Sequence, residues 1–168
     1  MKDLKNFKKI WKAEYEMKID NSSASIWKII TKPKNLELVH PFCQSNETIN
    51  WPGVGSKDIL IYHSGLKYIR EFLTWDEEKG YSLLIGEKDK EKSYVVWGIF
   101  KKKNDNYLKI TVYPYFLRNY PKFISFLPYH ILITPKLTEY LKSVVRGIDW
   151  YLKTGKKIEK NQFGKHSW

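Results

Sequence analysis

Residues 134–155 read TPKLTEYLKSVVRGIDWYLKTG, and this stretch decides the fold because it has the pattern of one long amphipathic helix. Thr134 and Pro135 suit the start of a helix, and Gly155 suits its end. The apolar residues that recur at helical spacing are Leu137, Leu141, Val144, Ile148 and Tyr151, widened by Tyr140, Val145 and Leu152. About twenty residues at roughly 1.5 Å each predict a rod of ~30 Å, long enough to cross a small domain.

The residues before this helix predict a series of short strands. Residues 12–20 alternate between apolar and charged side chains, the pattern of a half-buried antiparallel strand. Asn21, Ser22 and Ser23 offer helix caps, and Pro33 suits the start of a second short helix that ends at Val39. Six further strands are predicted at 42–49, 57–63, 67–75, 81–87, 93–101 and 107–113. The connections are short, so neighbouring strands should pair antiparallel.

Together these elements predict an α+β domain. A six- or seven-stranded antiparallel sheet should wrap around the long C-terminal helix, with two short helices after the first strand. A length of 168 residues favours one domain, 1–168. We expect its core at about 13–157, with a basic lead-in at 1–12 and a basic tail at 158–168.

The composition is globular, basic and rich in aromatic rings, at 42% hydrophobic and 16% aromatic residues with a net charge of +12. The charges are scattered, so solubility is a plainer interpretation than a dedicated polyanion site. Leu4, Phe7 and Trp11 among lysines form a basic amphipathic pattern, which makes an anionic membrane surface a candidate partner. Nucleic acid is a weaker use of the charge because no recognised binding motif is present. The oligomeric state is left open.

The sequence also excludes several kinds of site. Cys43 is the single cysteine, so neither an internal disulfide nor a thiolate metal cage can form. The histidines lack ligand spacing, and we predict no metal and no cofactor; they are His40, His63, His130 and His166. The first twenty residues lack the apolar core of a signal peptide, and no apolar run is long enough to span a membrane. We therefore expect a cytoplasmic protein.

The order of one strand, two short helices, six strands and a long helix resembles the SRPBCC superfamily, which includes START, Bet v 1-like and polyketide cyclase-like proteins. The residues 25–31 followed by His40 and Pro41 are similar to its first helix and helix-ending turn. The segment 51–55, WPGVG, is similar to its glycine-containing lead into the third strand. The resemblance implies a helix-grip fold that encloses an apolar cavity, and it brings no shared catalytic motif.

Inward-facing positions of the predicted sheet and helix give the candidate cavity residues. These are Tyr62, Tyr68, Arg70, Phe72, Trp97, Tyr113, Tyr140 and Val144. Arg70 would be a lone cation among apolar neighbours, so it needs a carboxylate or a ligand anion if it is buried. The plainer interpretation is that Arg70 extends to solvent at the edge of the sheet.

Three hypotheses for function follow. The first is binding of a hydrophobic or amphipathic molecule (lipid-, sterol- or polyketide-like) in the cavity. The second is a polyketide cyclase- or dehydratase-like enzyme in which a tyrosine or arginine polarises a carbonyl. The third is lipid transfer at a membrane surface. The connector 114–133 holds six aromatic rings and three prolines, and we expect it to form a gate or a lid over the cavity.

Overall fold

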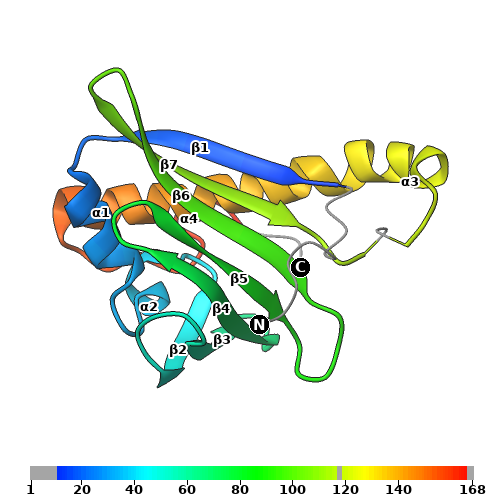
Figure 1. Ribbon diagram of the computed structural model, residues 1–168, viewed down its shortest axis with the longest axis horizontal. Helices are drawn as coiled ribbons and strands as arrows, with labels where there is room; N and C mark the ends of the chain where they lie inside the picture. Colours follow the sequence, from blue (N-terminus) through cyan, green and yellow to red (C-terminus); the bar gives the residue numbers. More distant parts are fainter. Residues whose placement is uncertain (1–10, 117–118, 166–168) are drawn as a thin grey trace.

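A seven-stranded antiparallel sheet forms the body of the protein and curls around a long C-terminal helix (Figure 1). The computed structural model describes residues 11–116 and 119–165. The strand order is β1-β7-β6-β5-β4-β3-β2, so six strands form a meander and β1 joins its far side beside β7. The predicted helix-grip arrangement is confirmed.

The strands lie within one or two residues of their predicted bounds because turn or loop residues separate them. They are β1 (Ala13–Ile19), β2 (Cys43–Asn50), β3 (Lys57–Tyr62), β4 (Lys67–Asp76), β5 (Gly80–Gly86), β6 (Ser93–Lys102) and β7 (Asp105–Tyr113). In β1, Ala13 and Ile19 are buried at the two ends of the strand, whereas Lys18 is exposed. The concave face of the sheet therefore carries the apolar residues toward the helix.

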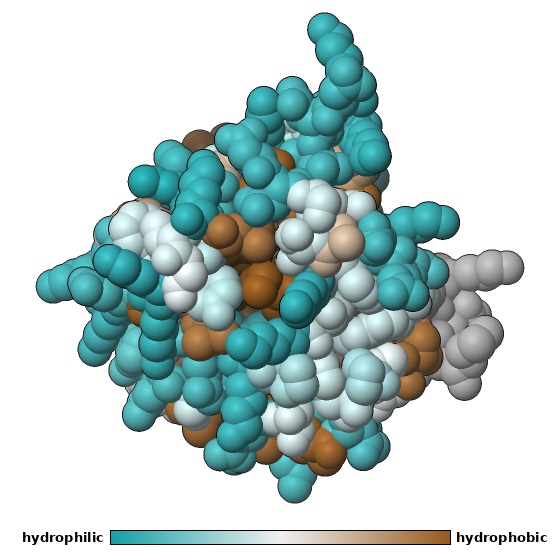
Figure 2. Space-filling model, turned by 90° about the vertical axis from the view of Figure 1, so that its left-hand side faces the viewer, coloured by the Kyte–Doolittle hydropathy of each residue, from teal (hydrophilic) through white to brown (hydrophobic). Residues whose placement is uncertain are grey.

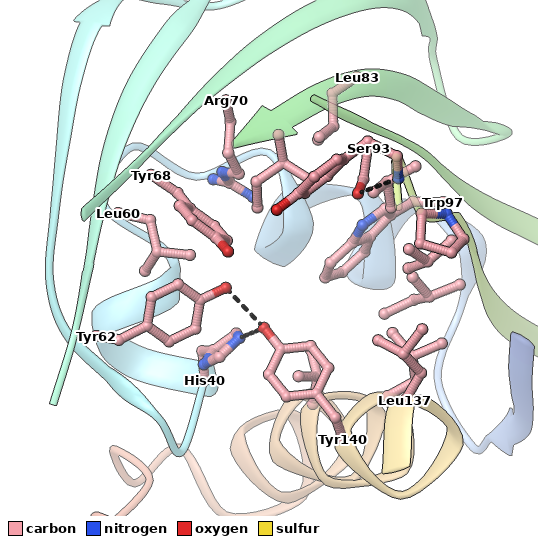
Figure 3. A pocket seen from close by; sticks show the side chains of 18 of the residues that line it. His40, Leu60, Tyr62, Tyr68, Arg70, Leu83, Ser93, Trp97, Leu137 and Tyr140 are labelled. Carbon is pink, nitrogen blue, oxygen red and sulfur yellow. Dashed lines mark hydrogen bonds between the residues drawn. The ribbon is translucent and has the colours of Figure 1, made fainter. Parts of the chain in front are cut away.

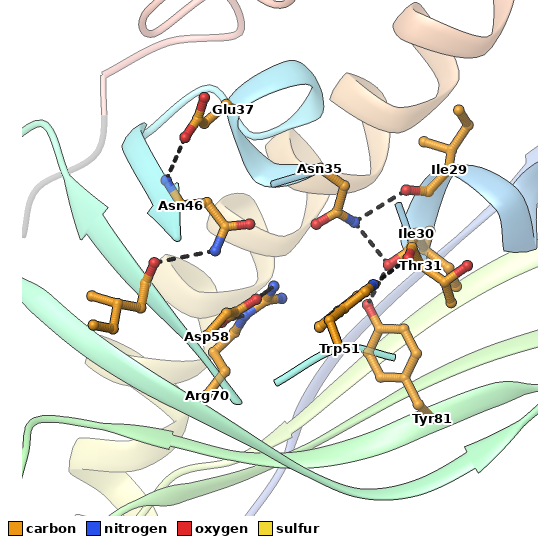
Figure 4. Close-up of polar contacts among 11 residues, drawn as sticks. Ile29, Ile30, Thr31, Asn35, Glu37, Asn46, Trp51, Asp58, Arg70 and Tyr81 are labelled. Atoms are coloured by element: carbon orange, nitrogen blue, oxygen red, sulfur yellow. Dashed lines mark hydrogen bonds and ion pairs between the residues drawn. The ribbon is translucent and has the colours of Figure 1, made fainter. Parts of the chain in front are cut away.

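Two short helices, α1 (Ser23–Ile30) and α2 (Leu36–Val39), close one end of the sheet. The Ser22 hydroxyl caps α1 by accepting a hydrogen bond from the Ser25 N–H at 3.1 Å. Asn35 is 1% exposed, and its amide donates to the carbonyl oxygens of Ile29 and Ile30 at 3.2 and 2.8 Å (Figure 4). These bonds satisfy the C-terminal carbonyls of α1 and fix the start of α2.

The last helix, α4 (Thr134–Thr154), lies along the concave side of the sheet. Its predicted stripe is buried, with Leu137, Leu141, Val144 and Ile148 all less than 9% exposed. Gly155 ends α4 in the left-handed conformation, with φ of 67°.

α4 does begin at Thr134, but the predicted role of Thr134 as the cap that starts the helical path is wrong. A helical path already begins with α3 (Lys122–Pro128) and continues through the π-helical turn η2 (Tyr129–Ile133) into α4. Thr134 is itself helical, with φ of −57° and ψ of −47°. Pro128 and Pro135 lie on this path, although proline lacks an N–H and collides with the carbonyl four residues back. The wider η2 turn lies between these two prolines, and a π-helical turn is one way in which a helix accommodates a missing bond.

Two further predictions concern membranes and the ends of the chain. Within residues 11–116 and 119–165, no helix is long and apolar enough to cross a membrane. The basic amphipathic pattern that includes Leu4 and Phe7 lies outside the described residues, as does His166. Trp11, its last apolar member, is described and is partly buried against α3 and η2.

Candidate ligand-binding cavity

A cavity of about 410 Å³ remains between the sheet and α4 (Figure 3). Its walls are mostly apolar; they include Leu36, Leu60, Leu83, Ile85, Val95, Ile110, Val112, Leu137 and Leu141. Binding sites for small molecules typically measure roughly 300–1,000 Å³ and combine apolar walls with a few polar groups. The size and lining of this cavity fall within that class.

Six of the eight candidate residues from the sequence line this cavity. They are Tyr62, Tyr68, Arg70, Trp97, Tyr140 and Val144. The alternation of the strands placed the first four correctly, and the helical stripe placed the last two. Their participation in ligand binding stays a prediction.

Phe72 and Tyr113 do not line the cavity. Phe72 is 1% exposed and packs edge-to-face against Trp51, Trp75 and Tyr81, in the core beyond Arg70. In β7 the inward positions are Ile110 and Val112, both in the cavity wall. Tyr113 therefore points to the other face of the sheet, where its ring stacks on Tyr94 with 5.8 Å between centroids.

Arg70 is buried rather than extended to solvent, which corrects the plainer interpretation. It is 3% exposed, and Asp58, at 0%, faces it across the β3–β4 pair. The guanidinium binds the carboxylate through two hydrogen bonds, Nε to Oδ1 at 2.8 Å and Nη2 to Oδ2 (Figure 4). β4 lies inside the sheet, between β3 and β5, so no solvent edge is within reach.

The ion pair makes this part of the cavity wall electrically neutral. Burial alone would lower the pKa of Arg70, but the charge and hydrogen bonds of Asp58 outweigh burial and raise it. Arg70 thus stays protonated and already has its anion. Sequence reasoning missed Asp58, although Asp58, Leu60 and Tyr62 share one face of β3 and the alternation could have identified it.

A second polar group in the cavity joins His40, Tyr140 and Tyr62 from three different elements. His40 follows α2, Tyr140 lies on α4 and Tyr62 ends β3. The Tyr140 hydroxyl oxygen lies 2.8 Å from His40 Nε2 and 2.9 Å from the Tyr62 hydroxyl oxygen (Figure 3). The sequence predicts both tyrosines as cavity residues, but its only signals for His40 are the absence of metal-ligand spacing and a place in the turn that ends a helix.

We call the hydrogen-bonded set His40, Tyr140 and Tyr62 the His40–Tyr140–Tyr62 relay. The positions of its protons follow from the groups that surround it. The backbone N–H of Phe42 donates to His40 Nδ1 at 3.3 Å, so Nδ1 is the acceptor and the neutral ring carries its proton on Nε2. Nε2–H is then the donor toward the Tyr140 oxygen. Burial raises the pKa values of both Tyr62 and Tyr140, so their hydroxyls stay protonated at neutral pH.

The described part of the chain holds neither a reactive thiol nor a cluster of metal ligands. Cys43 is buried, and burial raises the pKa of its thiol to about 12, so almost no thiolate forms at neutral pH. Among residues 11–116 and 119–165, no three His, Cys, Asp or Glu side chains gather as a metal site.

Comparisons with known proteins give structural likeness without sequence likeness. No protein-family model matches the sequence, and a search of curated proteins gives no match. SA2116 of Staphylococcus aureus, a protein of unknown function, matches 86% of this chain and 94% of its own, with a TM-score of 0.68 at 10% identity. Norcoclaurine synthase of Thalictrum flavum, solved as a point mutant with a transition state analogue, matches 86% and 95%, with a TM-score of 0.60 at 15% identity.

DynU16, a protein of the dynemicin biosynthetic locus, matches 87% of this chain with a TM-score of 0.64 at 13% identity. The match covers 48% of DynU16, so this chain spans about half the length of that protein. Identities this low establish a shared fold and no shared activity. By its strand order, its gripped helix and these neighbours, the chain has a helix-grip fold of the Bet v 1-like kind.

Proposed function

We propose that the protein binds a small, neutral, hydrophobic or amphipathic molecule in the cavity between the sheet and α4. The observation that supports this proposal most strongly is the cavity of about 410 Å³, a volume that the many large aromatic side chains of the protein do not fill. Apolar burial would supply most of the affinity, at roughly 25 cal/mol per Å². Lipid-, sterol- and polyketide-like molecules have this chemistry.

We expect a neutral ligand because the charged side chains at the cavity wall already neutralise each other. Arg70 and Asp58 compensate each other, and both are buried. A charged ligand would lose its hydration without gaining an unpaired counter-charge from that ion pair. A ligand with one carbonyl or hydroxyl group would instead find the hydroxyls of Tyr62 and Tyr140.

Binding can be tested with the apolar fluorophore N-phenyl-1-naphthylamine. We expect saturable binding with a negative heat-capacity change, which marks apolar burial. Val144 is 2% exposed and lines the cavity, so Val144→Trp should fill part of it and weaken binding by about tenfold or more. Overpacking can cost about 1–3 kcal/mol, so circular dichroism must first show that the variant is folded.

The control places the same bulky ring on the solvent side of α4, as Lys142→Trp, because Lys142 is partly exposed and does not line the cavity. That variant should bind the probe like the unmodified chain. Equal binding by a folded Val144→Trp variant would place the probe elsewhere and defeat the proposal.

A second candidate function is catalysis in the same cavity, favoured by the His40–Tyr140–Tyr62 relay. With His40 donating to Tyr140 and Tyr140 donating to Tyr62, the Tyr62 O–H would be left to donate to a ligand carbonyl. Such a donor would stabilise the enolate-like oxygen that forms when a polyketide cyclises. The norcoclaurine synthase neighbour, bound to a transition state analogue, is an enzyme with this fold.

Substituted 2-naphthols of increasing acidity separate binding from catalysis. A site built to stabilise an oxyanion should bind the more acidic naphthols more tightly, and Tyr62→Phe should remove that trend. Affinity that is independent of naphthol acidity would leave the protein as a binding module.

A further inference from the structure

The outer surface of α3 and η2, together with the turn just before α3, exposes a concentration of large apolar side chains. We call it the apolar tip; its members are Tyr120, Phe123, Ile124, Phe126, Leu127, Ile131 and Leu132. Each is more than half exposed, and Phe123 reaches 83%. They make up seven of the ten exposed large hydrophobic residues in the described part of the chain. A contiguous patch of this kind marks an interaction surface.

The apolar tip is held in place from its inner side. Ser125 and Tyr129 are buried, at 1% and 0% exposure. The Trp11 ring stacks on Tyr129 with 5.0 Å between centroids, and its indole N–H donates to the Ser125 hydroxyl at 3.0 Å. These contacts orient the helix and leave its other sides to solvent, so the exposure is part of a defined structure.

The position of α3 makes the apolar tip accessible. In Figure 1, α3 projects beyond the body of the sheet, at the end far from α1. The opposite end of the molecule, seen in Figure 2, is mostly hydrophilic, with small apolar areas between polar side chains. The protein is therefore amphipathic along its long axis.

Charge around the apolar tip favours an anionic occupant. Residues 106–138 contain no aspartate or glutamate, whereas Lys122 and Lys136 flank the tip and are exposed. A second copy of the chain docked tip to tip would bring these lysines together with no carboxylate from either segment. An anionic bilayer instead offers phosphates to the lysines and an apolar layer to the rings, and the net charge of +12 would attract the protein to it.

We propose that α3 and η2 dock the protein on anionic membrane surfaces by inserting the apolar tip at the lipid interface. Ile133, the last residue of η2, lines the cavity, as do Tyr115 and Phe116 on the segment before α3. Docking would therefore bring one wall of the cavity close to the bilayer, where hydrophobic molecules accumulate. Membrane docking itself does not depend on the cavity being occupied.

Co-flotation with vesicles tests the proposal directly. We expect the full chain to float with vesicles containing phosphatidylserine and to bind vesicles of phosphatidylcholine alone more weakly. The double variant Phe123→Glu, Leu127→Glu should weaken binding to the anionic vesicles by about tenfold or more. The matched control is Ile49→Glu, Val54→Glu, because these residues are 59% and 70% exposed but lie far along the chain from α3. The control should float like the unmodified chain.

Three results would overturn the proposal. One is no flotation with anionic vesicles, and another is equal flotation by the Phe123→Glu, Leu127→Glu variant. The third is a dimer of the unmodified chain in sedimentation velocity that is absent in this variant, which would assign the apolar tip to self-association. Naphthylamine binding by the same variant should be unchanged, and a folded Val144→Trp variant should still float, so failure of docking and failure of cavity binding are distinguishable.

Discussion

Arg70 of β4 and Asp58 of β3 lie directly opposite each other in the sheet and form a two-bonded ion pair beneath the apolar cavity. Both side chains are excluded from solvent, at 4% and 0% exposure. A pair of this kind contributes little net stability when intact, because desolvation of the two charges offsets their attraction. Its loss has a much larger effect, since one charge would remain buried without a partner.

Removal of the carboxylate charge should therefore destabilise the fold strongly. We expect Asp58→Asn to lower the free energy of unfolding by roughly 3–5 kcal/mol, because the Arg70 guanidinium would stay buried and uncompensated. Urea denaturation followed by tryptophan fluorescence measures this change. The double variant Asp58→Leu, Arg70→Met removes both charges and should lose much less stability. Equal losses in the single and double variants would show that packing, not charge, is the cause.

Tyr62 should distinguish ligands that carry a carbonyl group from those that do not. Prodan, a naphthyl ketone, can accept a hydrogen bond from the Tyr62 hydroxyl, whereas N-phenyl-1-naphthylamine has no carbonyl. Tyr62→Phe should weaken Prodan binding by roughly 0.5–1.5 kcal/mol, the net contribution of one hydrogen bond. Binding of the naphthylamine should change little. Parallel titrations by fluorescence measure both, and an equal loss for the two probes would indicate a change of cavity shape instead.

Much of the fold could be predicted because its signals are local. Residues 12–20 alternate between apolar and charged side chains, turn residues separate the other strands, and the stripe from Leu137 to Ile148 identifies one buried helix face. Alternation also placed Tyr62, Tyr68, Arg70 and Trp97 on the inward face. Patterns of this kind depend only on which side chains must leave water.

The errors concern contacts between segments distant in sequence. Asp58 and Arg70 are paired by strand register, and the bonds of Tyr140 to His40 and Tyr62 join residues 100 and 78 positions apart. Burial of a ring also depends on what covers it. Tyr129 is buried, whereas Phe123 and Phe126 are exposed. Tyr115, Phe116 and Ile133 of the connector 114–133 line the cavity, and the expected gate or lid stays a prediction.

Alkaline pH should destabilise the protein through its buried tyrosines. Burial raises the pKa values of Tyr62, Tyr81 and Tyr140, while tyrosines of the unfolded chain ionise near pH ~10. Above that pH the unfolded state loses protons that the folded state keeps. The contribution of these tyrosines to the free energy of unfolding is therefore fully present below pH ~10. It falls as pH rises toward the folded-state pKa values, by about 1.4 kcal/mol per pH unit for each such group.

Urea midpoints measured in small steps between pH 9 and 11.5, roughly the range in which free tyrosines titrate, test this dependence. Tyr81→Phe should reduce the slope of the unfolding free energy against pH by about 1.4 kcal/mol per pH unit, which corresponds to one proton. Phenolate absorbance should also rise abruptly at the unfolding transition. A slope that is the same in Tyr81→Phe and the unmodified chain would contradict the assignment.

Gly147 of α4 packs closely against Val39 at the end of α2. A Cβ atom added there would lie 2.0 Å from the carbonyl oxygen of Val39, a backbone atom that cannot turn aside. Alanine is the better helix former by about 1 kcal/mol, so propensity alone predicts that Gly147→Ala stabilises α4. We expect the opposite sign, a net loss of roughly 1–3 kcal/mol, because relief of the collision must separate the two helices.

Thermal unfolding of Gly147→Ala beside Gly98→Ala tests this argument. A methyl group at Gly98 meets no atom within 4 Å, so that variant should stay within about 0.5 kcal/mol of the unmodified chain. His40 follows Val39 directly and is hydrogen-bonded to Tyr140 of α4. Separation of the helices should therefore also lengthen the hydrogen bond between His40 and Tyr140. Prodan affinity should then fall in Gly147→Ala and not in Gly98→Ala. A Gly147→Ala variant that melts higher than the unmodified chain would show that the two helices are not in contact there.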